Sequence, residues 1–293
     1  MKELVVISGK GGTGKTSIVA SFAALAKNAV MVDCDVDAAD LHLILTPQIK
    51  ERQDFCGGYR ASIDTSKCSL CGLCAVTCRF DAVSERSDRG VVKGFFIDPF
   101  ACEGCGVCHY YCPDDAIILE QPANGELFIS EMRYGPMVHA KLGIGEENSG
   151  KLVALVRKNA REIAEARNTN YIIVDGPPGI GCPAISSITG ADIVLIVTEP
   201  TVSGFSDLKR VIQLTHHFQI KTVACINKWD INSSLTEEII GFCQKNNVET
   251  VGRIRYDKVF TDAQVQAANI FEVALTGIAE DIYSIWKNLS HLI

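Results

Sequence analysis

A glycine-rich loop near the N-terminus has the residue types and the spacing of a phosphate-binding site. Residues 9–16 read Gly-Lys-Gly-Gly-Thr-Gly-Lys-Thr and fit the pattern G-x-x-x-x-G-K-[ST]. The glycines let backbone N–H groups surround an oxyanion, and a helix that begins there adds positive potential. Lys15 is expected on the β- and γ-phosphates of a nucleotide, and the Thr16 hydroxyl on Mg²⁺. The predicted nucleotide-binding residues of this loop are Gly9, Gly11, Gly12, Thr13, Gly14, Lys15, Thr16 and Ser17.

Carboxylates follow two other apolar runs of the chain. The run 29–32 is followed by four aspartates within residues 33–40. Of these, Asp35, Asp37 and Asp40 are candidates for orienting or deprotonating an attacking water. The run 171–174 is followed by Asp175, which is expected to hold Mg²⁺ through water. These acids indicate hydrolytic chemistry beside the phosphate loop.

Eight of the thirteen cysteines fall in two runs that form an internal repeat. The runs are Cys68-x2-Cys71-x2-Cys74-x3-Cys78 and Cys102-x2-Cys105-x2-Cys108-x3-Cys112, offset by 34 residues. Because the chain shows no signal peptide, a disulfide framework is not expected and the spacing indicates metal. Zinc suits C-x2-C pairs, but two successive two-residue gaps, occurring twice, favour iron–sulfur clusters.

Each cysteine run resembles the bacterial ferredoxin sequence for a [4Fe–4S] cluster, in which the fourth cysteine ligates the other cluster. The resemblance implies a first cluster held by Cys68, Cys71, Cys74 and Cys112. It implies a second cluster held by Cys102, Cys105, Cys108 and Cys78. The second run ends in the usual proline, Pro113, whereas the first has Arg79 in its place, which affects the turn rather than the ligation.

The apolar runs predict the elements that carry these residues. A strand at 4–7, the loop, and a helix with apolar positions from Ile18 to Ala26 begin an alternation of strands and helices. Right-handed crossovers then give an α/β fold with a doubly wound, mostly parallel sheet and helices on both faces. We predict this P-loop NTPase fold at residues 1–60 and 122–293, with a small inserted α+β ferredoxin-like domain at 61–121. The stretch after Leu119 is poorly patterned.

Composition excludes several classes of function. The chain has 293 residues and a formal charge of −7, without the basic stripe that nonspecific DNA binding needs. No apolar run is long enough to predict a membrane span, and no signal peptide precedes the first strand, so we expect a cytoplasmic protein. The last helix is amphipathic, but Glu280 and Asp281 on its polar face favour packing on the sheet over binding to anionic lipid.

Lys10, in the phosphate loop, is the basis of a family resemblance. The sequence Lys10-Gly-Gly-x-Gly-Lys15-Thr resembles the deviant Walker A signature of the MinD/ParA superfamily, which includes nitrogenase iron protein and Mrp-type scaffold ATPases. The resemblance implies an ATP-dependent homodimer in which Lys10 reaches the partner's nucleotide. It also implies Asp35 as the carboxylate that acts on the water, and Gly176 and Gly179 as a hinge that senses the γ-phosphate.

The segment Asn227-Lys228-Trp229-Asp230 bears on the choice of nucleotide. It matches N-K-x-D, which recognises guanine in GTPases. The MinD class also places an asparagine at this strand end and uses adenine, so we favour ATP, with Asn227 as a contact to the base. Asp230 is then expected to cap the helix that begins near Ser233. Elsewhere, His139 is expected on the surface or in a turn. The cysteines outside the two runs are expected to be buried or packed, namely Cys34, Cys56, Cys225, Cys243 and Cys182.

These residues together predict an ATP-hydrolysing homodimer with ATP, Mg²⁺ and two [4Fe–4S] clusters as cofactors. The expected catalytic residues are Lys10, Lys15, Asp35 and Asp37. In the favoured interpretation, nucleotide state is coupled to electron transfer toward an unknown redox or cluster-accepting partner protein. One alternative is an Mrp-like ATPase that assembles or carries iron–sulfur clusters or other metallocofactors. The other is a positioning or scaffold ATPase with structural clusters. We expect no nucleic-acid partner, and the composition does not favour a membrane.

Overall fold

The computed structural model describes residues 1–143, 146 and 149–293, which form two compact units. The first unit comprises Met1–Gln53, Leu127–Lys141 and Ser149–Ile293, and the second comprises Asp54–Glu126 and Leu142–Asn148. The second unit begins earlier and ends later than the predicted insertion at 61–121. Within the described residues, no helix is long and apolar enough to cross a membrane.

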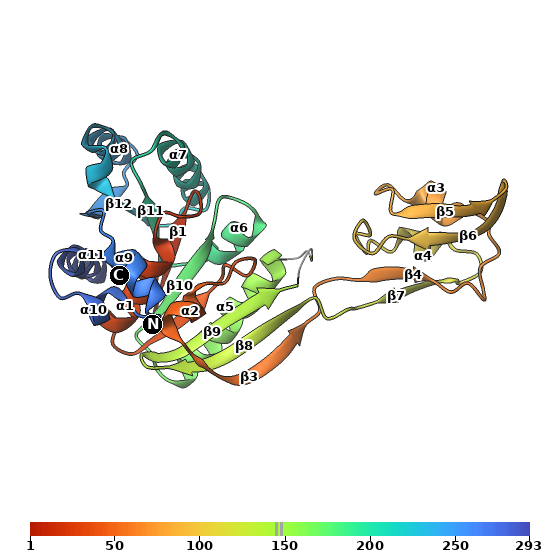
Figure 1. Ribbon diagram of the computed structural model, residues 1–293, viewed down its shortest axis with the longest axis horizontal. Helices are drawn as coiled ribbons and strands as arrows, with labels where there is room; N and C mark the ends of the chain where they lie inside the picture. Colours follow the sequence, from red (N-terminus) through yellow and green to blue (C-terminus); the bar gives the residue numbers. More distant parts are fainter. Residues whose placement is uncertain (144–145, 147–148) are drawn as a thin grey trace. The chain divides into compact units, whose positions relative to one another are not determined.

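A nine-stranded sheet forms the centre of the first unit (Figure 1). Its order is β13-β12-β11-β1-β10-β2-β9-β8-β3, and the seven strands from β13 to β9 pair in parallel. The mostly parallel α/β sheet predicted from the sequence is thus confirmed. The strands are β1 (Lys2–Ser8), β2 (Ala29–Asp33), β3 (Gln48–Phe55), β8 (Gly125–Met132), β9 (Gly135–Leu142), β10 (Tyr171–Pro178), β11 (Ile193–Thr198), β12 (Thr222–Asn227) and β13 (Glu249–Ile254).

Helices cover both faces of this sheet (Figure 1). On one face, α1, α2 and α9 to α11 share a core with alternate strand residues, and Phe22 packs on Trp286 with ring centroids 5.2 Å apart. The last helix therefore packs on the sheet, as its acidic polar face predicted. Helices α5, α6 and α7 contact β2, β10 and β11. The helices are α1 (Lys15–Leu25), α2 (Leu41–Leu45), α5 (Ser149–Ala166), α6 (Cys182–Ile188), α7 (Val202–His217), η1 (Trp229–Ile231), α8 (Ser233–Lys245), α9 (Val259–Val265), α10 (Ile270–Val273) and α11 (Ile278–Leu292).

Strands β3, β8 and β9 were not predicted from the sequence. Seven of the eight residues of β3 are exposed, so this edge strand has neither an apolar run nor an alternating pattern to reveal it. Strands β8 and β9 occupy the poorly patterned stretch after Leu119 and are joined at Arg133 and Tyr134. Further along the same stretch, residues 144, 145, 147 and 148 lie outside the described residues.

The second unit repeats its backbone as well as its sequence. Helices α3 and α4 begin after Gly72 and Gly106, which share a left-handed conformation with φ of 77° and 75°. Asp81 and Asp115 are also left-handed, with φ of 52° and 50°. The pair β4–β7 and the hairpin β5–β6 are both antiparallel. The elements are β4 (Arg60–Ile63), α3 (Leu73–Thr77), β5 (Val83–Asp88), β6 (Val91–Ile97), α4 (Val107–Tyr111) and β7 (Ile117–Glu120).

Candidate functional site

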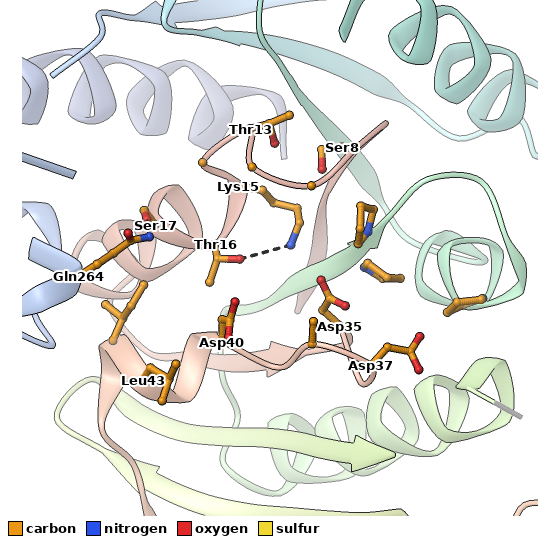
Figure 2. Close-up of a pocket in the computed structure, with 18 residues that line it drawn as sticks. Ser8, Thr13, Lys15, Thr16, Ser17, Asp35, Asp37, Asp40, Leu43 and Gln264 are labelled. Carbon is orange, nitrogen blue, oxygen red and sulfur yellow. Dashed lines mark hydrogen bonds between the residues drawn. The ribbon is translucent and has the colours of Figure 1, made fainter. Parts of the chain in front are cut away.

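The phosphate loop joins β1 to α1 and borders a cavity of about 650 Å³ (Figure 2). Gly14 lies at the start of the helix with φ 84°, and a Cβ there would lie 2.5 Å from the Asn227 amide nitrogen, so the position requires glycine. The predicted site residues that line the cavity are Gly11, Gly12, Thr13, Gly14, Lys15, Thr16, Ser17, Asp35, Asp37 and Asp40. The predicted residues Gly9, Lys10, Asp175, Gly179 and Asn227 are described but are not part of this lining.

Lys15 and Asp175 form a buried ion pair at the floor of the site. Their Nζ and Oδ1 atoms are 2.5 Å apart, and the side chains are 6% and 1% exposed. Burial alone would lower the pKa of Lys15, but the charge of Asp175, with smaller contributions from Asp33 and Asp35, raises it. Lys15 is therefore held as a cation at the position where phosphate is expected.

Asp33 is a site residue that sequence reasoning missed. Its fully buried carboxylate accepts hydrogen bonds from the N–H of Asp35 at 3.0 Å and from the N–H of Leu41 at 3.1 Å. It thereby fixes both ends of the acidic loop. Burial, followed by the charge of Asp175 on the neighbouring strand, holds the pKa of Asp33 well above its usual range. The available signal was its position at the end of β2, in register with Asp175.

Asp35 and Asp37 both face the cavity, and Figure 2 shows the Lys15 amine pointing toward the loop that carries them. Burial is the main reason that the pKa of Asp35 rises to about 6. Lys15 opposes this rise, and the charges of Asp175 and Asp37 add to it. A carboxyl with a pKa near neutrality suits a general base, so the geometry and the electrostatics both favour Asp35 for that role.

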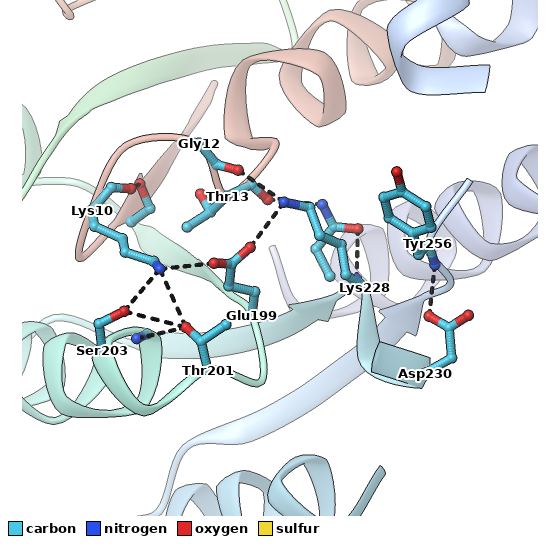
Figure 3. Close-up of polar contacts among 12 residues, drawn as sticks. Lys10, Gly12, Thr13, Glu199, Thr201, Ser203, Lys228, Asp230 and Tyr256 are labelled. Atoms are coloured by element: carbon cyan, nitrogen blue, oxygen red, sulfur yellow. Dashed lines mark hydrogen bonds and ion pairs between the residues drawn. The ribbon is translucent and has the colours of Figure 1, made fainter. Parts of the chain in front are cut away.

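Lys10 is bound within its own chain (Figure 3). Its Nζ lies 2.8 Å from Glu199 and donates to Thr201 at 3.2 Å and to Ser203 at 2.9 Å. Lys228 contacts the same Glu199 carboxylate at 2.9 Å and donates to the carbonyl of Gly12 at 3.1 Å. Burial would raise the pKa of Glu199, but hydrogen bonds from the two lysines lower it. The predicted reach of Lys10 to a partner's nucleotide stays a prediction.

The end of β12 supports the phosphate loop. The buried Asn227 side chain donates to the carbonyl of Thr13 at 2.8 Å and accepts from the N–H of Lys228 at 3.0 Å. Its contact with a base remains a prediction. The expected capping by Asp230 is wrong: Asp230 accepts from the N–H of Tyr256 at 2.7 Å. Helix α8 is capped instead by Asn232, which accepts from Leu235 N–H at 3.0 Å.

Gly176 and Gly179 follow Asp175 along the chain, where a nucleotide-sensing hinge was expected. A Cβ on Gly176 would lie 2.6 Å from the Ile7 side chain, so β10 can approach β1 only with glycine there. Gly179 has φ 89° and donates its N–H to the carbonyl of Ser8 at 2.9 Å. The segment expected to act as a hinge therefore has a defined, hydrogen-bonded conformation.

Some histidine and cysteine predictions need correction. His139 is buried on β9, where its Nε2 lies 3.0 Å from the Ser130 hydroxyl and its ring stacks with the rings of His42 and Phe128. It is therefore neither a surface nor a turn residue, and burial is the main cause that lowers its pKa to about 4.

Among the cysteines outside the runs, Cys34, Cys225 and Cys243 are buried as predicted, whereas Cys56 is exposed. Cys182 is exposed at the first residue of α6 and was expected to be packed.

The cysteine runs converge inside the second unit. A small cavity is lined by Cys78, Cys102, Cys105 and Cys108, the set predicted for the second cluster. Burial is the main cause that raises the pKa of Cys74 and of Cys108, and the neighbouring cysteines of each run add to it. Over the described residues, no three or more His, Cys, Asp or Glu side chains are close enough to hold one metal ion. Tetrahedral zinc needs such a group, whereas a four-iron cluster binds each thiolate through a different iron.

A P-loop between a buried strand and a helix, with Asp175 on the adjacent strand β10 and Asp33 at the end of the next strand β2, defines a nucleotide-binding α/β protein. Residues 4–270 match the family described as CbiA, the CobQ/CobB/MinD/ParA nucleotide binding domain. The chain belongs to this family of P-loop ATPases.

Individual relatives and solved structures agree with this assignment. The uncharacterized protein MJ0578 of Methanocaldococcus jannaschii is 34% identical over 235 residues, or 79% of each chain. The Aquifex aeolicus MinC:MinD cell division complex matches with a TM-score of 0.58 and 17% identity, covering 99% of this chain and 96% of that one. The Pyrococcus horikoshii septum site-determining protein MinD with Mg-ADP has a TM-score of 0.56 and 14% identity, with coverage of 99% and 96%. At these identities the solved structures show the fold.

Proposed function

We propose that this protein is an ATP-dependent molecular switch of the MinD/ParA type whose inserted unit binds two [4Fe–4S] clusters. The observation that carries the cluster proposal is the repeat: Cys78 of the first run joins three cysteines of the second around one cavity. The arrangement supports the exchange of fourth ligands that two-cluster ferredoxins use. The predicted division into a nucleotide fold and an inserted ferredoxin-like domain at 61–121 belongs to the same proposal.

The nucleotide half of the proposal rests on the family and on the cavity beside the phosphate loop. Asp175 and the Thr16 hydroxyl are oxygen donors of the kind that Mg²⁺ takes, and the similar MinD from P. horikoshii was solved with Mg-ADP. When bound, the metal would neutralise charge on the phosphates. Lys15 would bind the phosphates, Asp35 would accept a proton from water, and Asn227 would hold the loop while ATP is bound.

Asp230 supports ATP over GTP as the nucleotide. Recognition of guanine by N-K-x-D needs an aspartate carboxylate that is free to accept from the base. Here one oxygen of Asp230 already accepts from the backbone N–H of Tyr256 at 2.7 Å. Lys10, with the deviant Walker A spacing, supports a homodimer that forms around two ATP molecules. In that dimer Lys10 would leave Glu199 and contact the partner's nucleotide.

Three processes are candidates for what the ATP-dependent switch controls: positioning, electron transfer and cluster assembly. The similar solved structures favour one of them. The similar solved structures are cell-division proteins, one of them in complex with the partner MinC. They fit a positioning or scaffold ATPase better than an electron carrier. The eight cysteines support a redox role, because thiolate-bound [4Fe–4S] clusters supply one-electron transfer. A cargo role for the clusters, in assembly, is the remaining alternative.

Iron content in cysteine variants tests the cluster proposal. After anaerobic reconstitution we expect about eight irons per chain, from two four-iron clusters. Cys78→Ser and Cys112→Ser should each lower the iron content and the visible absorbance. Cys56→Ser is the matched control, because Cys56 is exposed and lies outside both runs. Equal iron in all four proteins would overturn the assignment of ligands.

Two measurements with and without Mg-ATP then separate the outputs. A nucleotide-dependent change in the cluster EPR signal, with iron retained, supports electron transfer. Loss of iron to apo-ferredoxin in the presence of a chelator supports assembly. ATP-dependent self-association with neither change supports positioning. Abolished ATP hydrolysis in Lys15→Ala, with iron unchanged, would show that the two sites are chemically separate.

A further inference from the structure

Helices α3 and α4 of the second unit lie against each other and expose apolar side chains at equivalent positions of the repeat. Val76 and Tyr110, 34 residues apart, are each 83% exposed. Leu73 and Val107, also 34 residues apart, are 42% and 37% exposed. We call these four residues the α3/α4 face. A single exposed apolar residue is ordinary, but a set duplicated across two touching helices indicates an interaction surface.

The net charge of the protein comes from the unit that carries this face. The second unit contains thirteen of the 35 acidic residues and six of the 28 basic ones, which leaves 22 of each in the first unit. The whole net charge of −7 therefore lies in the second unit, and thiolate-bound clusters would add to it. Exposed acids follow the cysteines of both runs at the equivalent positions Asp81 and Asp115.

The net negative charge of the second unit favours some binding partners for the α3/α4 face and disfavours others. A second copy would bring two strongly acidic units together, and repulsion opposes that contact. Nucleic acid and anionic lipid are repelled for the same reason. A protein with an apolar centre and a rim of lysine and arginine is attracted over a distance and then buries the four side chains.

We propose that the α3/α4 face is the docking surface for a basic partner protein. Each helix also carries the third cysteine of its run, Cys74 or Cys108, so a docked partner would sit within one helical turn of the cluster ligands. The inference deepens the proposed function and rests on it, because the clusters would hold both helices in place.

Ferric cytochrome c is a suitable probe, because lysines surround its apolar haem edge. We expect calorimetry on the iron-loaded protein to show binding that weakens at least tenfold between about 20 mM and about 200 mM salt. Val76→Ser with Tyr110→Ser should weaken binding about tenfold at constant salt. The control pair is Val265→Ser with Leu275→Ser, which are 82% and 84% exposed in the first unit and should leave binding unchanged.

Two results would overturn the docking proposal without contradicting the cluster proposal, provided that the protein contains its full complement of iron. One is salt-dependent binding that the Val76/Tyr110 pair does not change, which would show attraction to the unit without use of the face. The other is self-association of the wild type that this pair abolishes, which would make the occupant a second copy. A protein that takes up no iron instead counts against the proposed function, and against docking with it.

Discussion

Asp35→Asn should stabilise the nucleotide-free protein while it abolishes ATP hydrolysis. The pKa of Asp35 rises from 3.8 to about 6, mainly because of burial, so ionising this carboxyl costs folding free energy. About two pKa units correspond to about 3 kcal/mol at 1.36 kcal/mol per unit. The side chain keeps partial contact with solvent, so screening reduces the expected gain to about 1–2 kcal/mol.

The sign of this effect can be checked against pH. Between pH 4 and pH 6 the folded protein binds more protons at Asp35 than the unfolded chain does, so wild-type stability falls as pH rises through this range. An asparagine does not titrate. The gain in the midpoint of urea denaturation should therefore be near zero at pH 4 and complete at pH 8. A gain that is equal at both values, or a loss at pH 8, would refute the assignment of burial as the cause.

Three further substitutions follow from the same contacts. Lys15→Ala leaves the Asp175 carboxylate buried without its cation, so thermal denaturation should show a loss of about 3 kcal/mol; no loss would mean the pair is not formed. Glu199→Gln removes the charge that holds Lys10, so analytical ultracentrifugation should show more dimer at a given Mg-ATP concentration; less dimer would mean that Glu199 supports the dimer directly. Asn232→Ala should cost about 1 kcal/mol as a lost helix cap, measured by urea denaturation, and an unchanged midpoint would contradict that role.

The sequence predicts the structure correctly where residues close together in the chain determine it. Residues 9–16 predict the strand, loop and helix because the phosphate-binding geometry is local. The apolar runs of β1, β10 and β11 predict a parallel sheet because both of its faces are buried. Strand β3 escaped prediction because it is polar and exposed at the edge, where pairing with β8 rather than side-chain burial defines it.

The missed parts of the site depend on long-range contacts. Asp33 stands among four aspartates, and only the hydrogen bonds to Asp35 and Leu41 identify it as the one that fixes the loop. The contact between Lys10 and Glu199 joins residues 189 positions apart, and no local pattern announces it. Motifs therefore indicated the candidate chemical groups, whereas the residues that contact these groups were found only in the fold.

Lys10 and Lys15 of the phosphate loop differ in whether the carboxylate that each contacts would keep another cation if the lysine moved to a phosphate. When Lys10 leaves Glu199, that carboxylate keeps Lys228 at 2.9 Å, so release leaves no unpaired charge. When Lys15 turns to a phosphate, Asp175 is 1% exposed and loses its strong ion pair, so it needs another cation. Mg²⁺ arriving with the nucleotide would supply that cation. We therefore expect ATP in excess EDTA to bind at least tenfold more weakly than Mg-ATP, and Asp175→Asn to reduce this difference. Equal affinity with and without Mg²⁺ in the wild type would show that Lys15 does not exchange Asp175 for phosphate.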